Sequence, residues 1–154
     1  MLKKYKEHVD ERAKLNIPPL PLDADQTSQL VELLKSEHDE SEFLLSLFKE
    51  RIPAGVDQAA YVKAAFLADI TEGNTSSPYI KKTDAVGMLG TMLGGYNIQP
   101  LIECLKNDEL ADDAVDALSK TLLIFDAFNE VFELSKTNKY AEQVIKNWAD
   151  AKWF

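Results

Sequence analysis

The sequence contains few of the residues from which catalytic and metal sites are most often built. One cysteine, Cys104, and two histidines, His8 and His38, occur among its 154 residues. One cysteine excludes an internal disulfide and is too few to hold a zinc ion or an iron–sulfur cluster unaided. The histidines stand far apart, near predicted helix ends, and neither has the spacing of a metal ligand or a catalytic residue. We therefore expect no catalytic residue, no metal ion and no cofactor in this chain.

Basic residues and long apolar runs are also scarce. The chain has 17 Lys and Arg against 26 Asp and Glu, a net charge of -9. This charge disfavours nonspecific binding to nucleic acid or to an anionic membrane. No apolar stretch is long enough to span a membrane, and the first residues, MLKKYKEHVDER, lack the apolar core of a signal peptide. We expect a cytoplasmic location.

Helix signals, by contrast, run from end to end, and strand-like alternation is missing, which predicts an all-α fold. The expected helices in the first half cover residues 2–15, 25–36, 40–52 and 57–71. The segment IPPLPL ends the first of them because proline cannot continue a helix. The fourth is apolar nearly all round and is expected to be central.

Short local motifs mark where these helices begin. Asp23-x-x-Gln26 and Asp39-x-x-Glu42 resemble capping boxes, in which side chains satisfy the free N–H groups of a first helical turn. Asp57 is expected to cap the helix that follows it.

In the second half, a helix is expected to open at Thr83 and to end at Gly94-Gly95, and Asn97 is expected to cap the next one. A long helical stretch from 108 to 136 follows, with one possible break near Asn129. Its core stripe is Ala114, Leu118, Leu122 and Phe125, and a last helix covers the segment from Tyr140 to the end.

Helix pairs beginning near residues 25, 57 and 97 predict a loose repeat. We therefore expect residues 1–154 to form one domain, a HEAT-like irregular α-solenoid of antiparallel helix pairs. A plain helical bundle is the second choice.

Four of the six glycines fall in the segment GMLGTMLGGYNIQPL. On a helix, Gly87, Gly90 and Gly94 would form one bare stripe against which another backbone packs closely. A phosphate-binding loop is the alternative, but the spacing matches neither a dinucleotide-binding turn nor a P-loop. We interpret the segment as architecture, and Cys104, set among apolar residues, as a small buried hydrophobe rather than a reactive thiol.

Several segments resemble, in order, the N-terminal domain of bacterial aconitase B. They are VDQAAYVKAAFLADI, GMLGTMLGGYNIQPLI, ALSKTLLIFDAFNEV and NWADAKWF, and the similarity extends over essentially the whole chain. The block Gly-Gly-Tyr-Asn is its most specific element. The resemblance implies a non-catalytic HEAT-like piece of a much longer aconitate hydratase, which interconverts citrate and isocitrate through cis-aconitate. The [4Fe-4S] cluster of that enzyme is held by cysteines in other domains.

The resemblance further implies protein–protein contact and help in shaping substrate access. The expected partners are the remaining domains of the parent enzyme, a second copy of the chain or other metabolic proteins, and RNA only for the full-length protein. The candidate interaction or packing residues are Gly87, Gly90, Gly94, Gly95, Tyr96, Asn97, Gln99, Trp148, Trp153 and Phe154. Two alternatives stay open: a standalone helical adaptor, and a small-molecule site at residues 94–97.

Overall fold

A computed structural model describes residues 1–121 and 127–151. Within these residues the chain forms nine α-helices and no strand, which confirms the all-α prediction. The helices are α1 (Leu2–Lys14), α2 (Ala24–Leu34), α3 (Ser41–Glu50), α4 (Gln58–Glu72), α5 (Lys82–Leu89), α6 (Ile98–Cys104), α7 (Ala111–Ser119), α8 (Phe128–Ser135) and α9 (Lys139–Asp150).

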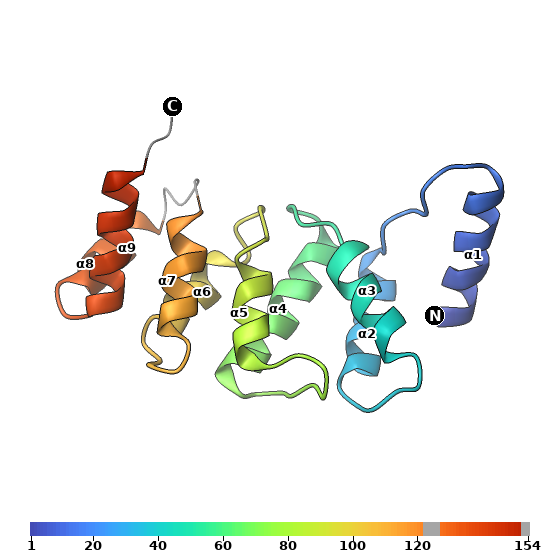
Figure 1. The fold of residues 1–154 in the computed structure, drawn as a ribbon, viewed down its shortest axis with the longest axis horizontal. Helices are drawn as coiled ribbons and strands as arrows, with labels where there is room; N and C mark the ends of the chain where they lie inside the picture. The colour runs from blue at the N-terminus through green and yellow to red at the C-terminus, as the bar shows by residue number, and fades with distance from the viewer. Residues whose placement is uncertain (122–126, 152–154) are drawn as a thin grey trace.

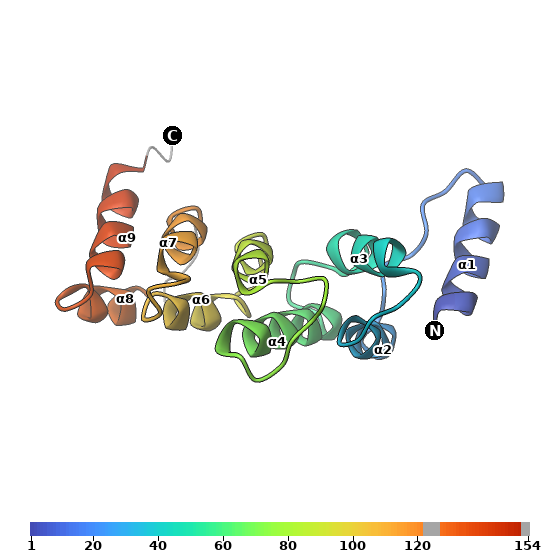
Figure 2. The same cartoon turned by 60° about the horizontal axis from the view of Figure 1, so that its bottom comes forward.

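After α1, the helices follow one another as pairs along an elongated array (Figure 1). Turned by 60°, the array shows two layers, with α2, α4, α6 and α8 in one and α3, α5, α7 and α9 in the other (Figure 2). Neighbouring pairs touch through α2 on α4, α5 on α7 and α7 on α9. The pairs begin at Ala24, Gln58 and Ile98, close to the predicted starts. This open array fits an irregular solenoid better than a closed bundle, while its specific relation to HEAT repeats stays a prediction.

Local capping chemistry explains two of the helix starts. Asp23 and Gln26 form the predicted capping box, with Gln26 N donating to Asp23 Oδ1 at 2.8 Å and Asp23 N donating to Gln26 Oε1 at 3.1 Å. Asp57 Oδ1 accepts from Ala60 N at the start of α4, as predicted. The second predicted box, Asp39-x-x-Glu42, is wrong, because α3 begins after Glu40 and has no side-chain cap.

The predicted glycine-striped helix is shorter than expected. α5 ends at Leu89, so Gly87 alone of the stripe lies inside it, whereas Gly90 is its C-cap and Gly94 lies in the following loop. Asn97 occupies the N-cap position of α6, as predicted, but its side chain makes no capping hydrogen bond. Its buried side-chain amide instead donates to Leu89 O at 2.8 Å and Met92 O at 3.2 Å, satisfying carbonyl groups where α5 ends.

The predicted stretch from 108 to 136 is also interrupted. α7 ends at Ser119 and α8 begins at Phe128, so the stretch is divided into two helices as expected, but the division lies before Asn129, which is inside α8. Ala114 and Leu118 are fully buried, as the predicted core stripe requires. Leu122 and Phe125 lie outside the described residues.

The core runs along the whole array, and α4, which packs against α2, α5 and α6, contributes more buried residues than any other described helix. Ala60, Phe66, Leu67 and Ile70 are all buried on this helix. The prediction that this helix is central is therefore confirmed. None of the helices in the described part of the chain is long and apolar enough to cross a membrane.

Candidate interaction surface

Two loops that are distant in sequence form one junction at the edge of the array. The loop after α3 carries Gly55, and the loop after α5 carries Gly94 (Figure 1). Leu93 N donates to Ala54 O at 2.7 Å, and the Tyr96 hydroxyl donates to Val56 O at 2.8 Å. The segment from Leu93 to Tyr96 therefore joins the loop that follows the pair of α4 and α5 to the loop that precedes this pair.

Gly94 lies in backbone-to-backbone contact within this junction. A Cβ atom built on Gly94 would come within 2.0 Å of Gly55 O and 2.9 Å of Val56 N. No side chain larger than hydrogen fits that space, because the obstructing atoms belong to the main chain. The predicted close approach is thus present at this glycine, but it involves a loop rather than a helix face.

Gly90 makes the helix-to-helix contact that the sequence analysis expected. A Cβ atom there would lie 2.8 Å from the Cβ of Ala117 on α7. Gly87, by contrast, is exposed and would have nothing within 4 Å of an added Cβ. The same is true of Gly95, whose φ of +90° explains the preference for glycine.

Replacing Gly90 with leucine is expected to destabilise the fold by roughly 1–3 kcal/mol, because the new side chain would overpack the contact with α7. Urea unfolding measures this change. Gly87→Leu is the matched control, since it adds the same side chain one turn earlier where space is open. Equal midpoints for Gly90→Leu and the unmodified chain would contradict the close packing of α5 on α7.

An apolar surface surrounds the loop junction. Leu93 is 84% exposed, Val56 73% and Tyr61 53%, and the rings of Tyr61 and Tyr96 meet edge to face at 5.3 Å between centroids. We call these four residues the loop patch. Large apolar side chains with this much exposure, gathered in one place, are typical of a surface that another protein segment covers.

A cavity of about 360 Å³ lies beside the loop patch. Gly90, Gly95 and Asn97 from the predicted set line it together with Leu93 and Ile98. Its walls are mostly apolar, and the side-chain amide of Asn97 donates its hydrogen bonds to main-chain carbonyls. The cavity therefore adds hollow apolar surface next to the patch rather than a set of converging polar groups.

The remaining predicted residues contact their own domain. Gln99 Nε2 donates to Glu130 Oε1 at 3.0 Å and so links α6 to α8. Trp148 Nε1 donates to Leu118 O at 2.9 Å, and its ring packs against Phe128 at 6.0 Å between centroids. Trp153 and Phe154 lie outside the described residues.

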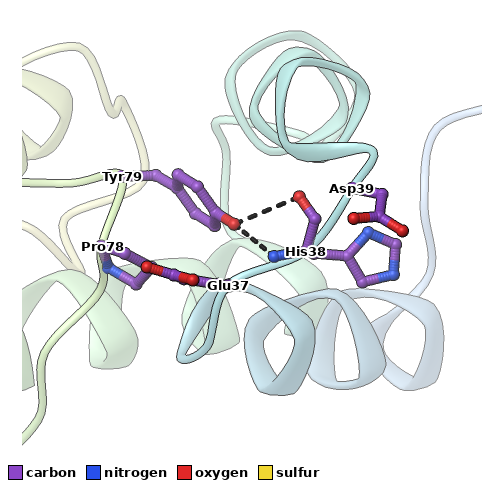
Figure 3. A pocket seen from close by; sticks show the side chains of 5 residues that line it. All are labelled: Glu37, His38, Asp39, Pro78 and Tyr79. Carbon is purple, nitrogen blue, oxygen red and sulfur yellow. Dashed lines mark hydrogen bonds between the residues drawn. The ribbon is translucent and has the colours of Figure 1, made fainter.

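A second hollow lies where the loop before α5 meets the turn after α2. Glu37, His38, Asp39, Pro78 and Tyr79 line it (Figure 3). The Tyr79 hydroxyl contacts both His38 N and His38 O, and His38 Nδ1 accepts from Glu40 N. Figure 3 shows the Glu37 carboxylate on the side of Pro78 and the imidazole turned away from it. These groups diverge, and the described residues contain no cluster of three or more potential metal ligands.

Cys104 is buried, as predicted, and burial raises the pKa of its thiol. A thiol with a raised pKa is mostly protonated near neutral pH and is a poor nucleophile or metal ligand. An iron–sulfur cluster, which needs several thiolates, does not fit the residues that the structure describes.

Val56, Tyr61 and Leu93 were not predicted to be surface residues. Apolar residues at helical spacing predict a core position equally well whether or not a neighbouring helix covers them. A cue for Leu93 lay in its place next to Gly94-Gly95, where a helix was already expected to stop.

The chain is similar in sequence to known proteins. The aconitate B N-terminal domain family matches residues 4–154. The chain is 55% identical to aconitate hydratase B of Synechocystis sp. and 54% identical to that of Escherichia coli, in each case over 100% of this chain. Aconitate hydratase B of Helicobacter pylori is 41% identical over 99% of it. The chain spans 18% of the length of each of these relatives.

Proposed function

This chain belongs to the aconitate B N-terminal domain family, and we propose that it serves an aconitate hydratase B as a non-catalytic helical domain that docks onto the rest of the enzyme. The relatives are more than five times longer than this chain, which spans 18% of them. The parent enzyme would interconvert citrate and isocitrate through cis-aconitate with a [4Fe-4S] cluster in its other domains.

The loop patch is the observation that carries the docking role. Leu93 and Val56 expose most of their surface, although burying such side chains is favourable by about 1.5–3 kcal/mol each. The junction beneath them is rigid, because Leu93 N and the Tyr96 hydroxyl hold the two loops together. A rigid apolar surface of this kind is suited to a permanent contact within one polypeptide.

We expect the remaining domains to shield Leu93. Leu93→Cys should react quickly with a maleimide in the 154-residue chain and severalfold more slowly in the full-length enzyme. Gln29→Cys, on an exposed position of α2, is the control and should react at similar rates in both. The native thiol of Cys104 is buried and contributes little to the labelling.

Equal labelling of Leu93→Cys in both proteins would overturn the docking role. Protection that grows with the concentration of the isolated chain would instead show that a second copy covers the patch. That result would replace docking by self-association.

We also propose that the docked domain helps to shape substrate access. The family resemblance and the cavity beside the loop patch support this role. In the full-length enzyme, Leu93→Asp is expected to raise the KM for citrate more than it lowers kcat, because the change touches the approach to the site and not its chemistry. An unchanged KM would contradict it.

A further inference from the structure

Lys63 is a buried lysine with no charged partner among the residues that the structure describes. It lies on the central helix α4, and its side chain is 4% exposed. It is the one charged residue among the buried side chains that the structure describes. Exposed lysines elsewhere form ion pairs, such as Lys106 with Glu103 and Lys120 with Asp116, but within the described ranges no carboxylate lies in ion-pair reach of Lys63.

The contacts of the Lys63 ammonium compensate little of its charge. Its Nζ atom lies 5.2 Å from the centre of the Phe48 ring, and the described residues accept no hydrogen bond from it. Burial lowers the pKa of Lys63. No buried side-chain nitrogen or oxygen among the described residues lacks a hydrogen-bond partner, so the Nζ atom itself reaches solvent while the rest of the residue is covered. Partial loss of water around an ammonium is unfavourable unless an anion or hydrogen-bond acceptors replace that water.

Lys63 lines an open cavity of about 550 Å³ between α3, α4 and α5. Lys49 of α3 and Asp84 and Met88 of α5 also line this space. Tyr79 forms part of the wall, but its hydroxyl is turned to the main chain of His38 on the other side (Figure 3).

The charged groups and hydrogen-bond donors that line this cavity indicate which class of ligand it would bind. Lys49 and Lys63 are positive and Asp84 is negative, so the lining carries one net positive charge. The Asp84 carboxylate accepts from Lys81 N at the start of α5. Thr83 offers a hydroxyl that makes no hydrogen bond with any described residue. One ammonium at the end of a covered side chain, the Thr83 hydroxyl in the same lining and one net positive charge match a single carboxylate better than a phosphate dianion.

We propose that the cavity between α3, α4 and α5 binds a carboxylate group through the ammonium of Lys63. The carboxylate belongs either to a small free acid or to an acidic side chain of the remaining domains. Both sources present the same carboxylate to Lys63, and experiments on the full-length enzyme distinguish them.

The first experiment uses the 154-residue chain and does not depend on the docking role. NMR of isotope-labelled lysines, assigned with Lys63→Met, follows the pKa of Lys63 during titration with sodium acetate, and sodium chloride of equal ionic strength is the control. Acetate is expected to raise the pKa of Lys63 toward its ordinary range, because a bound anion favours the charged ammonium. Chloride should leave it unchanged.

Two variants test whether Lys63 itself holds the carboxylate. Lys63→Met keeps the apolar stem of the side chain and should weaken acetate binding by about tenfold or more, because a charge-assisted hydrogen bond is lost. Lys14→Met removes the same charge from an exposed position outside the cavity and should leave binding unchanged. If Lys63→Met does not fold, Lys49→Met at the same cavity should still weaken binding, whereas unchanged acetate affinity would count against the site.

The second experiment identifies the source in the full-length enzyme. A carbodiimide that joins amines to adjacent carboxylates is expected to cross-link Lys63 to an Asp or Glu beyond residue 154 if a side chain occupies the cavity. If a free acid occupies it, no such cross-link forms and added acetate protects wild type, but not Lys63→Met, against heat. The proposal would be overturned if acetate left the pKa of Lys63 unchanged in the 154-residue chain and the full-length enzyme showed neither the cross-link nor the protection by acetate.

Discussion

Gly94→Ala is expected to destabilise the domain by about 3 kcal/mol or more, although it adds one methyl group. The added Cβ would lie 2.0 Å from Gly55 O and 2.4 Å from Gly55 C. A clash with a side chain is relieved by a change of rotamer, but this obstacle is main chain on a second loop. The two loops must therefore separate, and the hydrogen bond from Leu93 N to Ala54 O is weakened with them.

Urea unfolding of Gly94→Ala and Gly87→Ala makes the test specific. Gly87 lies inside α5, is exposed and has nothing within 4 Å of an added Cβ. Alanine there is expected to stabilise the domain by about 0.4–1 kcal/mol, because it reduces the freedom of the unfolded chain. If both variants shifted the unfolding midpoint in the same direction, the close contact of Gly94 with Gly55 would be wrong.

Phe48→Ala is expected to cost about 3–5 kcal/mol of unfolding free energy. Phe48 is fully buried on α3, and its ring meets that of Phe66 on α4 edge to face at 5.7 Å between centroids. Alanine leaves a cavity between the two helices and also removes the aromatic face next to the Lys63 ammonium. The lost transfer energy, the cavity and the lost ring contacts act in the same direction.

Phe132→Ala provides the control for this second prediction. Phe132 on α8 is 46% exposed, so truncating it should cost less than about 1 kcal/mol. Thermal and urea unfolding of both variants measure the difference. A loss for Phe48→Ala no larger than that for Phe132→Ala would show that α3 does not pack on α4 as described.

The double variant of Phe48→Ala and Lys63→Met tests whether the ring and the ammonium interact. Their two effects are expected to be non-additive, because each group lies in the surroundings of the other. Additive losses would limit the role of Phe48 to filling the core.

The starts of the helix pairs could be predicted because their causes are local. Asp23 and Gln26 bond each other, and Asp57 accepts from Ala60 N, in each case across three residues, and that spacing can be found in the sequence. The end of α5 could not be predicted in the same way. After α5, Leu93 N donates to Ala54 O, and the side chain of Asn97 donates to Leu89 O. Ala54 lies 39 residues from Leu93 in the sequence, so no local pattern indicates this bond.

The same division applies to the candidate surface. The glycine segment marked the right region, and close contacts exist at Gly90 and Gly94, but the shared helix face was wrong. In the sequence, Lys63 interrupts the largely apolar run AAYVKAAFLADI of α4. Its burial and its opening into a cavity depend on α3 and α5, whose positions no local pattern specifies.

By itself, the sequence determined the all-α class, the succession of helix pairs and the resemblance to the aconitase B N-terminal domain, because capping, periodicity and residue order are properties of the chain. The tertiary structure alone decided that Leu93 is exposed while most of Lys63 is buried. The physical reason is that the exposure of a side chain depends on which distant segments pack over it, and apolar or charged character alone does not specify those neighbours.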